Sequence, residues 1–243
     1  RRRHGRGPVT VVVSPLISLM EDQVFSLRSN GIPACFLGSG VSDLGIERKA
    51  EGGEFSLVFV TPEKIAYWDH GLQAIRNGPG LALFAVDESH CVAEWGHDFR
   101  PSYLELSCLR KKYPEVPIMA LTATATPRVE REIIANLGLR DPFVAKTSFN
   151  RSNLHYTVKV QGADKQVELR RLLTGLNGSA IVYVMTKKEA EDVASQVSQI
   201  VGSRGARGYH GGMSYTDRRE VHHAFLRDEI QVVVATLAFG MGI

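Results

Sequence analysis

The chain has 243 residues, which is enough for one large domain or two of ordinary size. Hydrophobic residues make up 44% and charged residues 23%, a composition that excludes intrinsic disorder and collagen-like sequence. The longest apolar runs, such as Leu81–Val86, have the length of a strand and fall far short of the ~18 residues of a membrane helix, and no stretch has the layout of a secretory signal. We therefore expect a soluble globular protein of the cell interior, with no membrane partner.

Cysteine content and net charge narrow the class further. The three cysteines, Cys35, Cys91 and Cys108, have no CxxC spacing, so we expect reduced thiols rather than disulfides or a zinc site. Lys plus Arg number 29 against 26 Asp plus Glu, which gives a formal charge of +3. A bias this small neither indicates nor excludes a polyanionic partner, so a nucleic-acid site would need positive groups that are placed locally.

A strand followed by a capped helix is predicted three times in the first part of the chain. The expected strands are Val9–Val13, Leu57–Val60 and Ile118–Leu121. Each is followed by a Ser-Pro or Thr-Pro pair that suits a helix start, because Ser and Thr are favoured N-caps and Pro is favoured at the first helical position. The pairs are Ser14-Pro15, Thr61-Pro62 and Thr126-Pro127. Such units are typical of an α/β fold with a parallel sheet covered by helices.

The ends of two of these strands are candidate phosphate contacts. Ligands of open α/β sheets bind at the carboxyl edge, where helix N-termini attract phosphate. Ser14, Pro15 and Thr61 are therefore predicted to contact a nucleotide or the backbone of a nucleic acid. Simple helix capping, worth ~1 kcal/mol per cap, explains the same residues, and spacing alone favours this second interpretation.

A second α/β unit is predicted after a polar linker at Thr147–Val160. We place the boundary near residue 150, which gives domains at residues 1–148 and 149–243. The expected elements of the second unit are strands at Ser179–Val184 and Gln231–Ala235, helices at Lys187–Ile200 and Ser214–Leu226, and a short strand that ends at Tyr209-His210. Two units of this size are expected to form a cleft between them.

Two adjacent acids mark the candidate chemistry. Asp87 and Glu88 directly follow the apolar run Leu81–Val86, and carboxylates at the end of a buried strand are costly unless a cation or a proton transfer uses them. We predict that Asp87 holds Mg²⁺ through water, because this ion keeps several waters and takes few carboxylates. Glu88 is predicted to orient and deprotonate an attacking water. An exposed acidic turn that caps a helix is the alternative.

Five segments resemble the RecQ family of ATP-dependent DNA helicases, and together they span nearly the whole chain. They are Val11–Gln23, which looks like motif Ia; the acid box Asp87–Cys91; the aromatic segment Glu94–Pro101; Ala120–Thr126, which looks like motif III; and Val234–Ile243, which looks like motif V. Ser89 stands where Ala is commoner in the family, and the match to motif IV around Ala180–Tyr183 is weak.

The resemblance implies an α/β fold of two RecA-like parallel-sheet domains, incomplete at both ends. It implies an enzyme that couples ATP hydrolysis to 3′–5′ translocation on single-stranded DNA and unwinds duplexes in DNA repair and recombination. The implied cofactors are ATP and Mg²⁺, and the implied DNA partners are single-stranded and forked DNA. The expected location is the nucleus in a eukaryote and the cytoplasmic nucleoid otherwise.

The matched motifs also suggest roles for individual residues. Aromatic faces stack on unpaired bases at ~1–3 kcal/mol each, and Arg adds phosphate and cation–π contacts. The expected DNA contacts of the aromatic segment are Trp95, His97, Phe99, Arg100 and Tyr103, unless the aromatic side chains belong to the core. The expected DNA contacts of the second unit are His210, Gly211 and Thr236. His90 is expected to act beside the two acids, by contacting the γ-phosphate or by bridging to Thr122 and Thr124, unless it is a structural histidine. The residues expected to couple hydrolysis to movement are Thr122, Thr124, Gly240 and Gly242.

Two parts of the ATPase machinery of this family are expected outside the sequence. No lysine follows a glycine, so the phosphate loop with its Gly-Lys-Ser/Thr ending is expected upstream of Arg1. The arginine finger is expected after motif V. We therefore predict that the isolated chain does not hydrolyse ATP. A non-catalytic nucleic-acid-binding module and an RNA helicase with a similar acid box are the alternatives.

Overall fold

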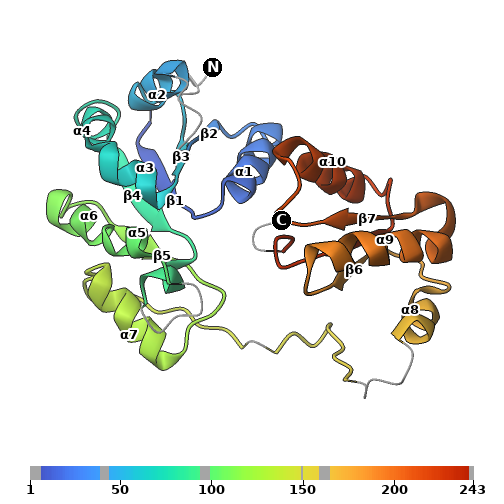
Figure 1. Ribbon diagram of the computed structural model, residues 1–243. Coiled ribbons are helices and arrows are strands. Elements are labelled where there is room, and N and C mark those ends of the chain that lie inside the picture. The colour runs from blue at the N-terminus through green and yellow to red at the C-terminus, as the bar shows by residue number, and fades with distance from the viewer. Residues whose placement is uncertain (1–6, 39–43, 94–98, 149, 159–164, 241–243) are drawn as a thin grey trace. The chain divides into compact units, whose positions relative to one another are not determined.

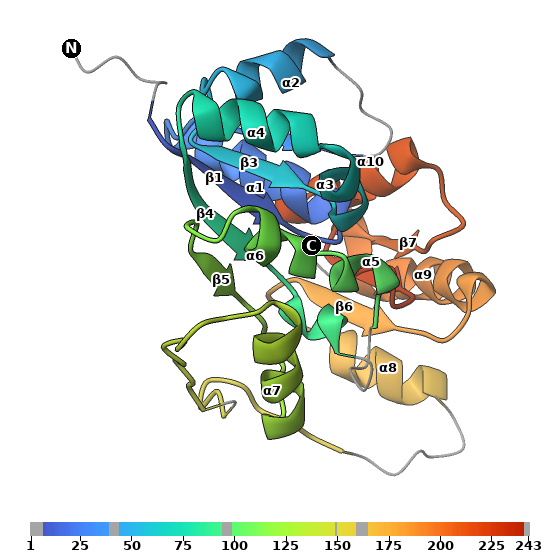
Figure 2. The same ribbon diagram turned by 90° about the vertical axis from the view of Figure 1, so that its left-hand side faces the viewer.

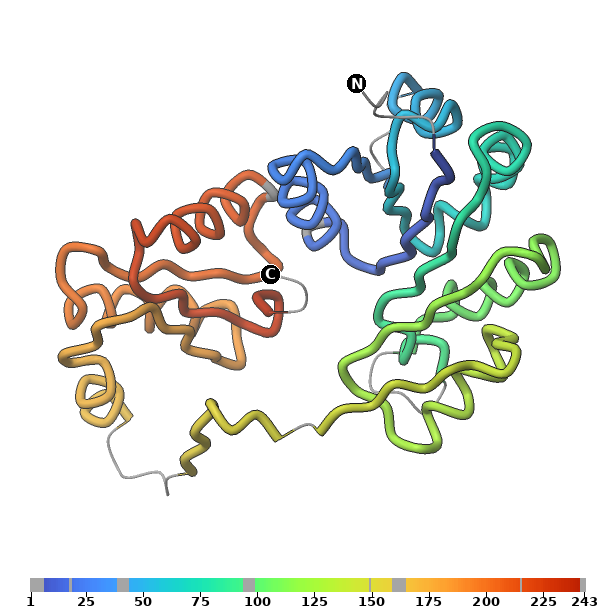
Figure 3. The backbone as a smooth tube through the Cα atoms, turned by 180° about the vertical axis from the view of Figure 1, so that it is seen from behind, coloured from blue at the N-terminus to red at the C-terminus, as the bar shows by residue number. Residues whose placement is uncertain are grey.

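The structure, a computed structural model, describes residues 7–38, 44–93, 99–148, 150–158 and 165–240. The chain forms two compact units, Arg1–Ala145 and Lys146–Ile243 (Figure 1). The described residues that join the last helix of the first unit, α7 (Pro127–Asn136), to the first helix of the second, α8 (Lys165–Leu173), contain no helix or strand (Figure 3). These residues include most of the linker that the sequence predicts.

The first unit is built on a five-stranded parallel sheet with the order β2-β3-β1-β4-β5. Its strands are β1 (Val9–Val13), β2 (Ala34–Leu37), β3 (Leu57–Val60), β4 (Leu81–Val86) and β5 (Ile118–Ala120). Val13 pairs with Val60 on one side and Val86 on the other, and Val86 pairs with Ala120. The carboxyl ends of these four strands therefore lie level with one another.

Alternation along β1 explains how helices cover both faces of this sheet. Val12 packs with Met20 and Val24 of α1 (Ile17–Ser29), whereas Val11 and Val13 join the larger core on the opposite face. Figure 2 shows α4 on the near side of the strands and α1 behind them. The helices that line or border the larger core are α2 (Leu44–Glu51), α3 (Pro62–Tyr67), α4 (Asp69–Asn77), α5 (Pro101–Leu104), α6 (Ser107–Lys112) and α7.

The second unit is a smaller sandwich of the same kind. Its parallel sheet has the order β6-β8-β7, with β6 (Ala180–Tyr183), β7 (Ala206–Tyr209) and β8 (Val232–Ala235). Val232 and Val234 of the central strand pack on α8 and α9 (Lys187–Val201), and Val233 and Ala235 face α10 (Tyr215–Leu226). The parallel-sheet fold predicted from the sequence is therefore confirmed in both units.

Most predicted helix starts are confirmed, and one is wrong. Thr61 and Thr126 cap α3 and α7 through their side chains, which accept from the N–H groups three residues later. Ser14 does not cap α1, which begins at Ile17 with Leu16 as its N-cap. The reason is that Ser14 continues the sheet, because its N–H donates to the carbonyl of Val60 at 3.0 Å. The β-ladder thus removes Ser14 from the helix.

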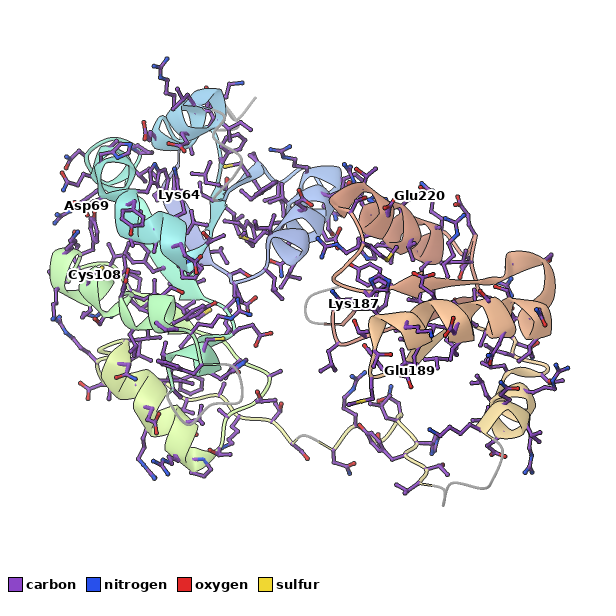
Figure 4. The ribbon with its side chains drawn as sticks, in the orientation of Figure 1. Lys64, Asp69, Cys108, Lys187, Glu189 and Glu220 are labelled. Carbon is purple, nitrogen blue, oxygen red and sulfur yellow. The ribbon has the colours of Figure 1, made fainter. Side chains whose placement is uncertain are left out.

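The second unit begins its main helices as predicted. Thr186 and Glu189 form a reciprocal capping box at the start of α9, where Figure 4 labels Glu189, and Ser214 caps α10. The three cysteines are free thiols, and two of them are buried. Within the described part of the chain, no helix combines the length and apolar character that crossing a membrane requires.

Candidate functional site

Backbone hydrogen bonds gather the predicted acidic residues and motif III at the carboxyl edge of the first sheet. The N–H of Asp87 donates to the carbonyl of Val13 at 2.9 Å, which extends the β1–β4 ladder by one residue. The N–H of Ser89 donates to the carbonyl of Leu121 at 2.9 Å, immediately after β5. The segments after β4 and β5 are therefore joined to each other as well as to the sheet.

The two acids stand in different backbone conformations. Asp87 still follows the strand, whereas Glu88 has a φ of 46° in the left-handed region, which is uncommon for a residue with a side chain. The N–H of Glu88 donates to Oδ1 of Asp87 at 2.9 Å. Both side chains are half-buried. Backbone strain of this kind concentrates at functional sites.

His90 links the acidic pair to motif III. Its ring, which is only 3% exposed, places Nδ1 at 2.9 Å from Oγ1 of Thr122 and at 3.2 Å from Oε2 of Glu88. An ionised carboxylate only accepts hydrogen bonds, so Nδ1 must carry the proton that faces it. Oγ1 of Thr122 also accepts from the N–H of Thr124 at 3.1 Å. The predicted bridge from His90 to Thr122 and Thr124 is therefore present as a continuous chain of contacts.

The oxygen donors of this edge fit a hard divalent cation. Asp87 offers carboxylate oxygens beside a backbone that is fixed to the sheet, and Mg²⁺ prefers one or two carboxylates together with water and phosphate oxygens. Elsewhere, Glu47, Glu51 and His70 bring ligand atoms within 4.8 Å of one another. Glu47 is already paired with the ammonium group of Lys64, which Figure 4 labels. The strand-end acids are thus the better candidate for Mg²⁺.

The aromatic segment is described only in part. Trp95 and His97 lie outside the described residues. Phe99 is 37% exposed, and Arg100 is half-buried with its N–H bonded to the carbonyl of Cys91 at 3.1 Å. That bond holds the downstream end of the segment against the short 3₁₀ turn Ser89–Val92, directly after the acidic pair. Phe99 and Arg100 therefore remain candidates for contact with a base and a phosphate.

Tyr103 has a different role from the predicted one. Its side chain is 0% exposed within the larger core, so the expectation that it stacks on a base is corrected. The phenol instead donates to the carbonyl oxygen of Asp87 at 3.0 Å. Burial raises the pKa of the Tyr103 phenol far above its ordinary value, so the group stays a hydrogen-bond donor. The Tyr103 hydroxyl therefore holds the backbone of Asp87 in place by a hydrogen bond from within the core.

Ser14 and Thr61 are also corrected as side-chain contacts. The Ser14 side chain is 0% exposed, and its hydroxyl has no hydrogen-bond partner among the described residues. The Thr61 hydroxyl is buried and accepts from the N–H of Lys64 at 3.1 Å. Helix capping therefore accounts for Thr61, and the sheet accounts for Ser14. Pro15 is half-buried and carries no N–H to offer a phosphate.

In the second unit, the predicted residues meet at the carboxyl edge of the smaller sheet. The N–H of Thr236 donates to the carbonyl of Tyr209 at 3.1 Å, which brings Thr236 beside His210 at the end of β7. Gly211 is exposed. Gly240 has a φ of 129°, and a Cβ there would collide with the hydroxyl of Tyr183. Gly242 lies outside the described residues.

Two residues that sequence reasoning did not single out hold this edge in place. Tyr183 donates its hydroxyl to the carbonyl of Phe239 at 2.7 Å, which fixes the turn after β8. Glu191 of α9 places Oε1 at 3.1 Å from Nε2 of His210. Tyr183 lies within the predicted strand Ser179–Val184, but a lone Glu in a polar helix carries no signal of its own. Only the packing of α9 on β7 reveals its partner.

Comparison with known proteins gives the same picture. Residues 2–133 match the DEAD/DEAH box helicase family, and residues 164–243 match the helicase conserved C-terminal domain. The chain is 41% identical over 98% of its length to the mouse bifunctional 3′-5′ exonuclease/ATP-dependent helicase WRN. It is 40% identical over 97% of its length to the ATP-dependent DNA helicase RecQ of Pasteurella multocida. It spans only 17% and 37% of these two proteins.

Solved structures share the fold at lower identity. The helicase Lhr of Mycobacterium smegmatis, bound to single-stranded DNA and AMP-PNP, aligns with 99% of this chain and 35% of its own at a TM-score of 0.64 and 22% identity. The helicase MrfA, bound to DNA and AMPPNP, aligns with 97% of this chain and 36% of its own at a TM-score of 0.69 and 16% identity. These likenesses support two RecA-like units. The chain belongs to the DEAD/DEAH box helicase family and, within it, to the RecQ type.

Proposed function

We propose that this chain supplies most of the motor of an ATP-dependent DNA helicase, which moves 3′–5′ along single-stranded DNA and separates the duplex ahead during repair and recombination. The observation that carries the proposal is the chain of contacts from Glu88 through His90 to Thr122. These contacts join Glu88, an acid suited to activating water, to the motif III segment that follows β5. The RecQ-type relatives support the choice of DNA as substrate.

The two acids take separate parts in hydrolysis. Asp87 is assigned to hold Mg²⁺ through water, and the ion, when bound, neutralises charge on the ATP phosphates. Glu88 orients the attacking water and accepts its proton. His90 keeps the Glu88 carboxylate in place, because its buried ring contacts both Glu88 and Thr122. A movement of Thr122 would therefore be transmitted to Glu88, the proposed general base, by the side chain of His90.

DNA contact is assigned to residues of both units. In the first unit these are Trp95, His97, Phe99 and Arg100, which stack on bases and contact phosphate without reading sequence. In the second unit they are Gly211 and Thr236 together with the loop that His210 begins. Cycles of ATP binding and hydrolysis alternate the grip of the two units on the strand. The cellular location proposed for this activity is the nucleus or the bacterial nucleoid.

The decisive test replaces the general base in the full-length gene product. Glu88→Gln keeps the size of the side chain but removes the proton acceptor, so we expect kcat for ATP to fall by about 10²–10⁴-fold while nucleotide binding is retained. Glu105→Gln is the matched control, because Glu105 is an exposed acid of the same unit. Unchanged turnover in Glu88→Gln would overturn the assignment.

The same protein distinguishes the alternative functions. We expect single-stranded DNA to stimulate the ATPase more strongly than RNA of the same length, and stimulation by RNA alone would indicate an RNA helicase. DNA binding that weakens with salt but is never accompanied by ATP turnover would indicate a non-catalytic binding module. For the isolated 243-residue chain we expect DNA binding without turnover, because it contains no Gly-Lys pair for a phosphate loop.

A further inference from the structure

The imidazole of His210 is held at both of its nitrogens. Nδ1 lies 3.2 Å from the backbone N of Gly212, and Nε2 lies 3.1 Å from Oε1 of Glu191. A backbone N–H only donates, so Nδ1 must be the unprotonated nitrogen that accepts from it. The proton of the neutral ring therefore lies on Nε2 and points at the Glu191 carboxylate. This pair of contacts selects one of the two neutral tautomers.

The ring lies beneath a loop whose backbone is exposed. The His210 side chain is only 12% exposed, whereas Gly211 and Gly212 are both exposed. The carbonyl of His210 accepts from the N–H of Met213 at 3.1 Å, so the loop is a tight turn. The surface that this turn presents to a ligand is thus glycine backbone and not the imidazole. His210 supports the loop from inside.

Glu191 reaches this ring from a neighbouring helix. It lies one turn after Lys187 on α9, which packs along β7, and a Cβ added to Gly208 of β7 would stand 2.9 Å from its Oε1. Lys187, labelled in Figure 4, borders the same loop, since a Cβ on Gly212 would stand 3.3 Å from its Nζ. One face of α9 therefore offers both a carboxylate for the ring and an ammonium group beside the exposed backbone.

We infer that Glu191 is a positioning residue for DNA binding by the loop 210–212. Its carboxylate keeps the proton of His210 on Nε2, which leaves Nδ1 to hold the Gly212 N–H and fixes the turn in the shape that meets a DNA phosphate. The inference rests on the proposed function, because it assumes that this loop contacts DNA. Simple electrostatics predicts the opposite effect of Glu191 on DNA affinity, because a carboxylate near a phosphate repels it.

Two substitutions separate positioning from repulsion. Glu191→Gln keeps an oxygen that accepts from Nε2–H but removes the charge, and Glu191→Ala removes both. Positioning predicts that Glu191→Gln binds a single-stranded oligonucleotide at least as tightly as the wild type. It predicts that Glu191→Ala binds roughly three- to tenfold more weakly, the range expected for one lost hydrogen bond. Pure repulsion predicts tighter binding by both variants, and that result would overturn the inference.

The matched control is Glu220, an exposed acid on α10 that pairs with Arg207 at 3.0 Å on the other side of β7 (Figure 4). Glu220→Ala removes the same charge without touching His210, so we expect its DNA affinity to equal or exceed that of the wild type. Weakening by Glu220→Ala to the same extent as by Glu191→Ala would overturn the inference as well. Fluorescence anisotropy of a labelled single-stranded oligonucleotide measures the DNA affinity of the complete chain and of each variant. Only variants that unfold at the same temperature as the wild type are compared.

A second measurement does not depend on DNA. Nitrogen-15 NMR of the imidazoles at neutral pH reports the tautomer of each of the eight histidines, and the His210→Ala variant identifies the signal of His210. We expect the Nε2–H form in the wild type and in Glu191→Gln, and a mixture of tautomers in Glu191→Ala. An unchanged spectrum in Glu191→Ala would refute the positioning role. If the spectrum changes but His210→Ala binds DNA normally, the assigned DNA contact fails while the link from Glu191 to His210 stands.

Discussion

Tyr103→Phe is the sharpest test of how the acidic pair is supported. The change removes one oxygen from a fully buried ring and leaves the rest of its packing in place. The oxygen donates at 3.0 Å to the carbonyl of Asp87, the residue assigned to Mg²⁺. That carbonyl lies at the end of β4, where the ladder to the neighbouring strands stops. Without the phenol, it loses the donor that reaches it from α5.

The expected cost follows from the burial of both partners. A typical hydrogen bond contributes ~1 kcal/mol net, and a buried acceptor left without a donor costs about 1–3 kcal/mol. We therefore expect the free energy of unfolding of the first unit to fall by about 1–2 kcal/mol. For a unit of this size, that loss lowers the Tm by roughly 2–6 °C.

Tryptophan fluorescence measures this unit alone. Both tryptophans of the chain, Trp68 and Trp95, belong to the first unit, so urea unfolding followed by their emission does not report on the second. Tyr67→Phe is the matched control, because it removes the same hydroxyl from a side chain that is 86% exposed. If the two variants unfold at the same urea concentration, the hydrogen bond from Tyr103 to Asp87 contributes nothing to the stability of the first unit, and the supporting role of Tyr103 is refuted.

Three further changes test other parts of the structure. Trp95→Ala in the full-length gene product is expected to reduce DNA stimulation of the ATPase more than basal hydrolysis, and equal losses would indicate a core role. Burial raises the pKa of the Cys35 thiol to about 12, so the unfolded chain releases this proton first and the first unit loses up to about 4 kcal/mol as the pH rises from 9 to 12. Between pH 9 and 12, the urea midpoint of Cys35→Ala should fall less steeply with pH than that of the wild type. If both fall with the same slope, the Cys35 thiol does not contribute to the loss of stability. Thr186→Ala should cost ~1 kcal/mol and speed hydrogen exchange in the first turn of α9, whereas the exposed Thr157→Ala should not.

The sequence predicts the fold well wherever local signals agree. Thr61-Pro62 and Thr126-Pro127 begin helices because a hydroxyl cap and a fixed φ are both local properties. Ser14-Pro15 shows the limit of the same pattern, since the N–H of Ser14 bonds to Val60, more than forty residues away in the chain. The helices α2 and α8 and the strand β2 were not among the predicted elements. The two helices have short segments of mixed polarity, and β2 is an apolar run of only four residues, so the burial pattern of each is set by its neighbours in the fold.

The candidate site divides in the same way. The sequence predicts Asp87 and Glu88 as site residues because two acids after an apolar strand are costly without a use, and the resemblance to RecQ helicases supports them and implies the role of His90. The sequence predicts Tyr103 as a DNA contact together with the aromatic residues near it, but its burial in the larger core and its bond to the carbonyl of Asp87 set its orientation. Glu191 could not be predicted because its partner, His210, lies directly after β7, in a separate part of the chain. Which side chain faces which partner is a tertiary property, and composition does not encode it.

The left-handed backbone of Glu88 has a consequence for protein engineering. A side chain in that region is held there at a cost of about 1–2 kcal/mol, which glycine would not incur and asparagine would incur less. Selection for thermal resistance alone would therefore favour those residues at this position and discard the acid. Mutations chosen to stabilise this chain should leave residue 88 unchanged, because the replacement that relieves the backbone strain there would also remove the acid that is proposed as the general base.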